Sequence, residues 1–183
     1  MNIWQGKRIK LRAIEPSDAG VFFEWNQDSE MSRNLDFVWP PTSLEFVRQW
    51  LEKKASERPE GDLLHLVMEN DQGQVVGSIS THRCDRRTGT FSYGLNVRPE
   101  HQRQGYASEA IVLVLRYFFE ELRYQKAWTH VHSDNIASIR LHERLGFQLE
   151  GRLRRMLFSR GQYLDDLVYG VTVEEFQAVH SGL

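Results

Sequence analysis

A short glycine-containing stretch carries the residue types that suit a bound phosphate. Residues 102–108 read Gln-Arg-Gln-Gly-Tyr-Ala-Ser and join an expected strand to an expected long helix. Gly105 lets the backbone approach a ligand closely, and Arg103 adds a cation. A helix start offers four unpartnered N–H groups and roughly half a positive charge. The junction is therefore predicted to bind phosphate or pyrophosphate; an ordinary tight turn is the alternative. It is neither a Walker loop nor the three-glycine dinucleotide pattern.

A second segment, residues 135–147, carries a polar stripe. Asn135, Ser138 and His142 fall within about 60° of one another on one face of a helix. A polar stripe is unusual on a short helix that only packs between two strands. Asn135 is also a good N-cap, and Ser138 could serve the first turn. Capping does not account for His142.

Both segments need a framework of strands and helices to position them. Apolar periodicity and turn residues predict strands at 8–14, 62–69, 74–82, 89–97, 126–133, 147–159 and 163–173. They predict helices at 15–28, 41–57, 107–122 and 135–146. Thr42 or Ser43 is expected to cap the second helix, and Gly73 and Gly161 to lie in hairpin turns. A meander followed by β-α-β units implies a mixed sheet with helices packed on it.

Composition narrows the class of protein. The 183 residues suit one domain, 1–183, and the net charge of −2 gives no reason to expect a nucleic-acid partner. Cys84 is the only cysteine, so neither an intrachain disulfide nor a cysteine-based metal cage is expected. The first residues lack the apolar core of a signal peptide, and no run approaches a membrane span. A cytoplasmic protein without membrane partner or metal is the expectation.

The two segments together resemble the signature motifs of the GNAT superfamily of N-acetyltransferases. Residues 102–107 resemble its Gln/Arg-x-x-Gly-x-Gly/Ala loop, and residues 135–147 resemble its Asn-x-x-Ala/Ser-x-x-x-Tyr-x-x-x-Gly-Phe helix. The start of the chain, the sequence Tyr-Ala-Ser-Glu-Ala after the loop and residues 150–166 look more narrowly like the branch that acetylates ribosomal-protein N-termini and related amines. The resemblance implies an α/β (α+β) fold. Its single GNAT-like domain would have a mixed, mostly antiparallel, V-splayed central sheet of about six to seven strands flanked by helices.

The resemblance also implies a cosubstrate, acetyl-CoA, and a set of residues that hold it. The loop would bind its pyrophosphate, and the preceding strand would pair with its pantetheine arm as an added strand. A backbone N–H of that strand would polarise the thioester carbonyl. The implied coenzyme-binding residues are Leu95, Asn96, Val97, Gln102, Arg103, Gln104, Gly105, Tyr106, Ala107, Ser108, Asn135, Ser138 and His142.

In such enzymes an amine attacks the acetyl thioester directly, so an acid and a base are needed. His142 stands where the family often has a tyrosine that protonates the departing thiolate. Ser138 is the rival, because members of the branch often use a serine on this helix. Ser92 stands where the branch often has a glutamate. The base is therefore left open among His82, Glu143, Glu150, Asp165 and Asp166.

The acceptor is expected to be a peptide α-amine or a small amine. A polyamine acceptor, another acyl donor, and a non-catalytic acyl-CoA sensor are the alternatives. Helix 15–28 and the residues after it are rich in carboxylates. These carboxylates either attract a cationic amine to the acceptor site or simply form a helix face exposed to solvent. Trp25, Phe37 and Trp39 could line a pocket or fill core. Arg152, Arg154 and Arg155 could bind coenzyme phosphate, a partner subunit or nothing. Dimers are frequent in the branch, so a homodimer is a further expectation.

Overall fold

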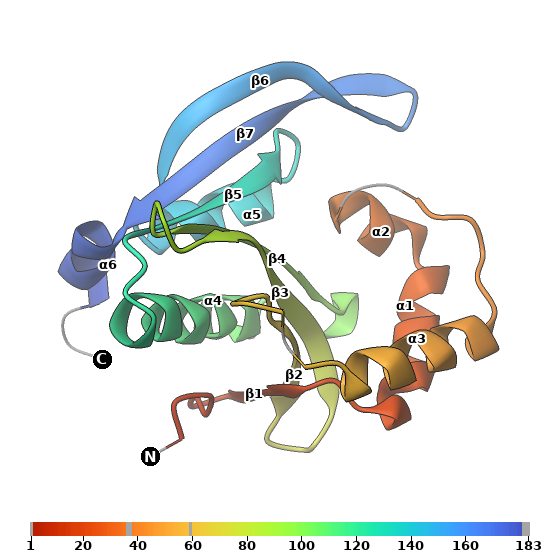
Figure 1. The fold of residues 1–183 in the computed structure, drawn as a ribbon. Helices are drawn as coiled ribbons and strands as arrows, with labels where there is room; N and C mark the ends of the chain where they lie inside the picture. The colour runs from red at the N-terminus through yellow and green to blue at the C-terminus, as the bar shows by residue number, and fades with distance from the viewer. Residues whose placement is uncertain (1, 36–37, 59, 181–183) are drawn as a thin grey trace. The chain divides into compact units, whose positions relative to one another are not determined.

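A computed structural model describes residues 2–35, 38–58 and 60–180. Seven strands follow the hydrogen-bonded order β1-β2-β3-β4-β5-β7-β6 (Figure 1), which confirms the expected mixed sheet flanked by helices. The strands are β1 (Ile9–Ala13), β2 (His65–Asn70), β3 (Val75–Asp85), β4 (Thr90–Val97), β5 (Lys126–His132), β6 (Gln148–Ser159) and β7 (Gln162–Thr172). The α-helices are α1 (Ala19–Gln27), α2 (Ser29–Leu35), α3 (Leu44–Ser56), α4 (Tyr106–Arg116), α5 (Ile136–Arg144) and α6 (Val173–His180). Every helix among the described residues is too short or too polar to cross a membrane.

The chain forms two compact units, and β3, β4 and α4 each contribute to both. The prediction of one domain over 1–183 stays a prediction, as does the splay of the sheet. The first unit comprises residues 1–81 and 94–114, and the second comprises residues 82–93 and 115–183.

In the first unit, antiparallel β1, β2 and β3 support the helices α1 to α3. Phe22 of α1 belongs to their apolar cluster, with its ring 4.6 Å from Trp25 and 6.0 Å from Trp50. Burial of such large rings is the main stabilising contribution of the cluster. Ser43 caps α3, because its hydroxyl accepts the N–H of Phe46 at 3.1 Å. The structure thus selects Ser43 over Thr42 as the cap.

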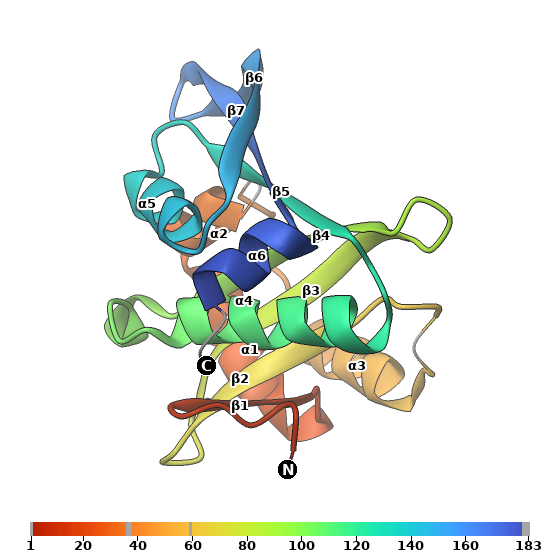
Figure 2. The same ribbon diagram turned by 90° about the vertical axis from the view of Figure 1, so that its left-hand side faces the viewer.

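In the second unit, residues 90–92 of β4 pair with β5 in parallel, and β5, β7 and β6 pair antiparallel. A parallel pair needs a crossover connection, which the helical segment 106–121 supplies. Phe91 stacks on Phe118 at 3.9 Å in the core of this unit. α5 lies against the same strands (Figure 2), where the Tyr169 hydroxyl of β7 donates to Glu143 at 3.2 Å.

Candidate functional site

The loop before α4 has the backbone shape that the sequence predicts for an anion site. Arg103 and Gly105 both have left-handed backbone angles, with φ of 62° and 85°. Alternation of such residues turns successive N–H groups to one side and makes a concave anion-binding nest. In α4 the N–H of Glu109 bonds back to the Gly105 carbonyl at 3.0 Å, so the amides before it belong to the open first turn.

The two glutamines of the loop fold back onto it. The Gln102 amide donates to the carbonyl of Val97 at 3.2 Å, and Gln104 accepts the hydroxyl of Tyr106 at 3.0 Å. Tyr106 is buried, while Arg103 and Gly105 are exposed. The side chains of Gln102, Gln104 and Tyr106 therefore hold the loop in shape, and the exposed backbone and Arg103 face solvent.

Arg8 is a basic residue beside this loop that the sequence analysis missed. A Cβ placed on Gly105 would lie 3.6 Å from Cδ, Nε and Cζ of Arg8. The Arg8 guanidinium has no hydrogen bond or ion pair with the residues that the structure describes. Two cations, Arg8 and Arg103, therefore accompany the nest. No local sequence signal marks Arg8, because the proximity arises from the fold.

Glu109, in the first turn of α4, anchors the segment that carries Arg8. Its carboxylate accepts the backbone N–H groups of Lys7, Arg8 and Ile9, the last two at 2.9 and 3.1 Å. Gly6 makes room for the clamp, since a Cβ there would collide with the Glu109 carboxylate. The start of the chain is thus tied to the helix that begins at the loop.

The end of β4 offers backbone rather than side-chain groups. Leu95, Asn96 and Val97 are half-buried. The Asn96 amide oxygen is used within the sheet, where it accepts the N–H of Ser78 at 2.9 Å. The predicted contact of these residues with a pantetheine arm would therefore rest on main-chain groups. These residues and the loop belong to the first unit.

In the second unit, Asn135 is the N-cap of α5. Its side-chain oxygen accepts the N–H of Ser138 at 3.0 Å, which is the capping role that its sequence position allowed. Ser138 is half-buried, and its hydroxyl lies 3.4 Å from Nδ1 of His142. The cap uses the backbone N–H of Ser138, so the Ser138 hydroxyl takes no part in it.

His142 is a buried, neutral imidazole. It is 2% exposed, and Nδ1 lies 2.8 Å from the Ser138 carbonyl, so Nδ1 carries the proton and donates it. Burial lowers the pKa of His142, and the hydrogen bond to Ser138 offsets this only in part. Nε2 is buried without a hydrogen-bond partner in the described structure. Such a group is a poor proton donor at neutral pH.

The carboxylates predicted as alternative bases are engaged within the protein. Glu150 pairs with Lys126 at 2.5 Å, and Glu143 accepts the hydroxyl of Tyr169. Asp165 accepts the side chain of Arg152, as described below. Asp166 pairs with an imidazole of β5, His130, that the sequence analysis did not name. The remaining candidate, His82, has its pKa lowered by burial and by the neighbouring Arg83.

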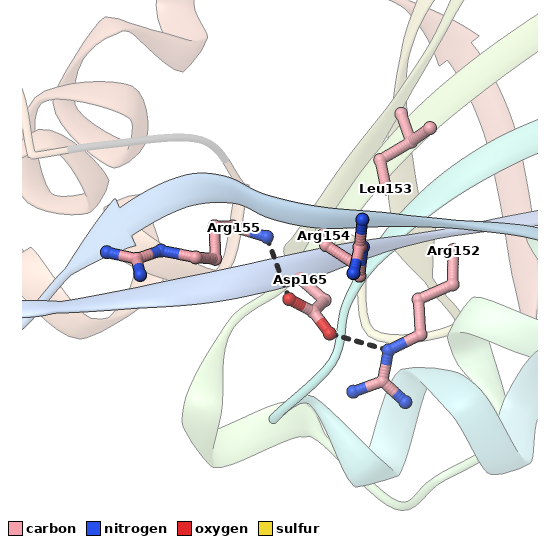
Figure 3. Close-up of a pocket in the computed structure, with 5 residues that line it drawn as sticks. All are labelled: Arg152, Leu153, Arg154, Arg155 and Asp165. Atoms are coloured by element: carbon pink, nitrogen blue, oxygen red, sulfur yellow. Dashed lines mark hydrogen bonds and ion pairs between the residues drawn. The ribbon is translucent and has the colours of Figure 1, made fainter.

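A hollow on the β6–β7 hairpin is lined by Arg152, Leu153, Arg154, Arg155 and Asp165 (Figure 3). Asp165 lies between two of the arginines, accepting the backbone N–H of Arg155 at 2.8 Å and Nε of Arg152 at 2.5 Å. These contacts lower the pKa of Asp165, with the Arg155 N–H the larger cause. None of the predicted coenzyme-binding residues lines the hollow, and Asp165 partly neutralises it. The register of β6 against β7 shifts between Leu153 and Leu157, so these arginines lie at a bulge, and their role in binding stays a prediction.

The mixed sheet and the exposed loop at the start of α4 are the two features that the resemblance to acyltransferases using a coenzyme thioester leads one to expect. Residues 8–148 match the family described as Acetyltransferase (GNAT) domain. The chain is 43% identical over 177 residues to the SPbeta prophage-derived uncharacterized N-acetyltransferase YokL of Bacillus subtilis (strain 168), covering 97% of each chain. It therefore belongs to the GNAT acetyltransferase family.

Two further likenesses extend this result. Spermidine N(1)-acetyltransferase of Vibrio cholerae serotype O1 (strain ATCC 39315 / El Tor Inaba N16961) is 27% identical over 161 residues, which cover 86% of this chain and 89% of that protein. The crystal structure of spermidine N-acetyltransferase from Vibrio cholerae in complex with CoA and spermine has the same fold, with a TM-score of 0.81 and 22% identity. That match covers 93% of this chain and 99% of the other. The chain is an N-acetyltransferase, and its acetyl donor is acetyl-CoA.

Proposed function

We propose that this N-acetyltransferase acetylates a peptide or protein N-terminal α-amine or a small primary amine by direct attack on the thioester. The nest at Arg103 and Gly105, with the Arg8 cation beside it, would hold the coenzyme pyrophosphate. The main chain of residues 95–97 would pair with the pantetheine arm. These roles follow from the family resemblance and are supported by the exposed loop backbone.

The observation that carries the choice of acceptor is the state of the carboxylates between residues 15 and 30. Asp18 is buried against Arg12 at 2.9 Å, and Glu24 pairs with Arg98 at 3.4 Å. Glu30 pairs with Arg33. Asp28 caps α2, accepting the N–H groups of Glu30 and Met31. Glu15 belongs to a capping box with Asp18. Carboxylates already partnered are poor ligands for a polycation, which favours a monoamine.

The aromatic residues near these carboxylates do not change this choice. Trp25 is buried in the core cluster. Trp39 is 62% exposed, and Phe37 lies outside the described residues. Trp25 therefore fills core, and Trp39 lies at the surface.

A polyamine acceptor is the second candidate. It is favoured by the likeness to the Vibrio cholerae protein named spermidine N(1)-acetyltransferase. A panel separates the two: an alanine-led peptide, a simple alkyl monoamine and spermidine, each with acetyl-CoA and detection of free thiol. Turnover of spermidine at a kcat/KM well above those of the other two amines would replace the first proposal by the second.

Ser138 is the proposed proton donor to the departing thiolate. The Nδ1–H of His142 is held by a backbone carbonyl, and burial keeps that ring neutral. Ser138, by contrast, is half-buried, and the hydrogen of its hydroxyl can rotate to a new acceptor. His142 would then orient the first turn of α5. Ser138→Ala is expected to lower kcat by a much larger factor than it raises the Kd for acetyl-CoA.

The coenzyme site is tested by calorimetry with acetyl-CoA on wild type, Gly105→Glu and Gly105→Gln. Glutamine matches glutamate in bulk and in the backbone strain of a side chain at this left-handed position, but carries no charge. Loss of binding in Gly105→Glu beyond that in Gly105→Gln would support an anion at the loop. Equal binding by wild type and both variants would mean that the junction is only a turn.

A further inference from the structure

A histidine–aspartate pair spans β5 and β7 in the second unit, where the two strands lie side by side (Figure 1). Asp166 pairs in register with His132, so it is the diagonal neighbour of His130 on the same face. Oδ2 of Asp166 lies 2.5 Å from Nδ1 of His130. A carboxylate oxygen only accepts, so the Nδ1–H donates to it. This leaves the lone pair of Nε2 as the basic atom of His130.

Burial of the pair is strongly asymmetric. The Asp166 side chain is 8% exposed, whereas the His130 side chain is 38% exposed. The second oxygen of Asp166, Oδ1, is buried and has no hydrogen-bond partner in the described structure. Burying a carboxylate oxygen without a hydrogen-bond partner costs free energy, and such groups are rare in native proteins. The imidazole thus bridges a buried carboxylate and solvent, as in the dyads of enzymes that use histidine as a base.

Neighbouring side chains limit the orientation of the imidazole. Its ring lies 5.1 Å from the Trp128 ring, in an edge contact. The Arg83 guanidinium lies over the Trp128 ring, 5.2 Å from its centroid. His132, two residues further along the same face, makes no side-chain hydrogen bond or ion pair with the described residues. Of the two histidines on this face, only His130 is held by a carboxylate.

His130 and Ser138 lie on opposite sides of the strands. Side chains alternate along β5, and Thr129 is buried while its neighbour His130 is exposed. Thr129 pairs with Tyr169, whose hydroxyl contacts α5, the helix that carries Ser138. Direct acetyl transfer takes a proton from the amine and gives one to the sulfur. These two proton transfers can be served by different groups, one on β5 and one on α5.

We infer that His130 is the general base of the acetyl transfer and that Asp166 is its positioning residue; this rests on the proposed function. Nε2 of His130 takes one proton from the substrate ammonium. The freed nitrogen lone pair forms the N–C bond, the C–S bond breaks, and the sulfur leaves with its electron pair. A second amine proton is passed on as the sulfur is protonated, and the third stays on the product amide. His130 then returns its proton to solvent.

The test compares His130→Gln, Asp166→Asn and His132→Gln in steady-state kinetics with an amine of the panel. His130→Gln is expected to lower kcat by about 10²- to 10⁴-fold, with the calorimetric Kd for acetyl-CoA unchanged. Asp166→Asn is expected to lower kcat in the same sense and to leave that Kd unchanged. His132→Gln is the matched control and is expected to stay within about twofold of wild type.

Chemical rescue separates a base from a merely structural histidine. Added imidazole is expected to restore part of the activity of His130→Ala and none of the activity of Ser138→Ala. Equal kcat values for His130→Gln and His132→Gln would overturn the inference, as would a loss that imidazole does not relieve in a folded variant. A wild type that binds acetyl-CoA but acetylates no amine of the panel would instead overturn the proposed function, and the inference with it.

Discussion

At the scale of single residues, Arg8 is expected to strengthen coenzyme binding through its charge. Its guanidinium lies against Gly105 and is unpaired in the described structure. Arg8→Gln should weaken acetyl-CoA binding by about fivefold, a modest factor because an exposed cation is screened by water and salt. Calorimetry at low and high salt measures it, and the loss should shrink at high salt.

Lys7→Gln is the matched control for Arg8→Gln. Both residues donate a backbone N–H to Glu109, but only the Arg8 side chain is placed at the loop. Equal effects of the two substitutions would mean that net charge, rather than position, governs binding.

His142 is expected to make stability depend on pH. Burial holds the pKa of the folded-state imidazole below its usual 6.5, so the unfolded chain binds the proton more readily. The stabilisation is complete above about pH 6.5 and is lost as pH falls toward the folded-state pKa, with a slope of at most about 1.4 kcal/mol per pH unit. Urea unfolding at pH 7.5 and 5.5 measures it. His142→Gln, which cannot titrate, should lose less stability between the two; parallel losses would contradict the prediction.

Residue types predicted some contacts of the site and not others. Asn135 was foreseen as a cap because capping is local in sequence. The inward turn of Gln102 and Gln104 was not foreseen, because their partners are set by the shape of the loop. Arg8 and His130 were not identified from the sequence, because the residues that they contact, Gly105 and Asp166, are remote from them in the chain. The roles of the site residues in catalysis stay predictions.

At the scale of elements, the Glu109 clamp is expected to couple β1 to the loop before α4. Glu109→Gln would weaken the acceptor for three backbone N–H groups and loosen the segment that carries Arg8. If Glu109 acts by holding Arg8, the losses in acetyl-CoA affinity from Glu109→Gln and Arg8→Gln should not add in the double variant. Calorimetry on the two single variants and the double variant gives the coupling energy. Additive losses would mean that the two residues act separately.

The strands and the longer helices were predictable from periodicity, whereas two short helices were not. α2 has seven residues, and α6 follows β7 without a turn. For α6 a signal was present: Thr172 and Glu175 form a capping box, in which each side chain accepts the backbone N–H of the other. The apolar run of β7 continues to Val173, so the predicted strand extended past the capping box and the helix was not recognised. Short helices of this kind depend on tertiary packing more than on propensity.

At the scale of the whole molecule, a single domain over 1–183 predicts a single unfolding transition. Cooperative domains lose secondary and tertiary structure together. Thermal unfolding followed by far-UV and near-UV circular dichroism should therefore give coincident curves. Two separated transitions would show that the two compact units unfold independently, and would contradict the prediction.

Binding should also raise the stability of the whole molecule. Acetyl-CoA at 100 times its Kd is expected to add about 2.7 kcal/mol to the free energy of unfolding. The same experiment on Gly105→Glu serves as the control, since that variant should gain little. The homodimer and the cytoplasmic location stay predictions.

The left-handed backbone of Arg103 has a consequence for engineering. A non-glycine residue there costs about 1 kcal/mol that glycine would not, so a procedure that ranks substitutions by folding energy would replace this arginine with glycine. The product should be harder to unfold and should hold its coenzyme less firmly, because the cation beside the nest would be gone. We therefore expect this position to lose some folding stability in exchange for coenzyme binding, and thermostabilised versions should leave Arg103 untouched.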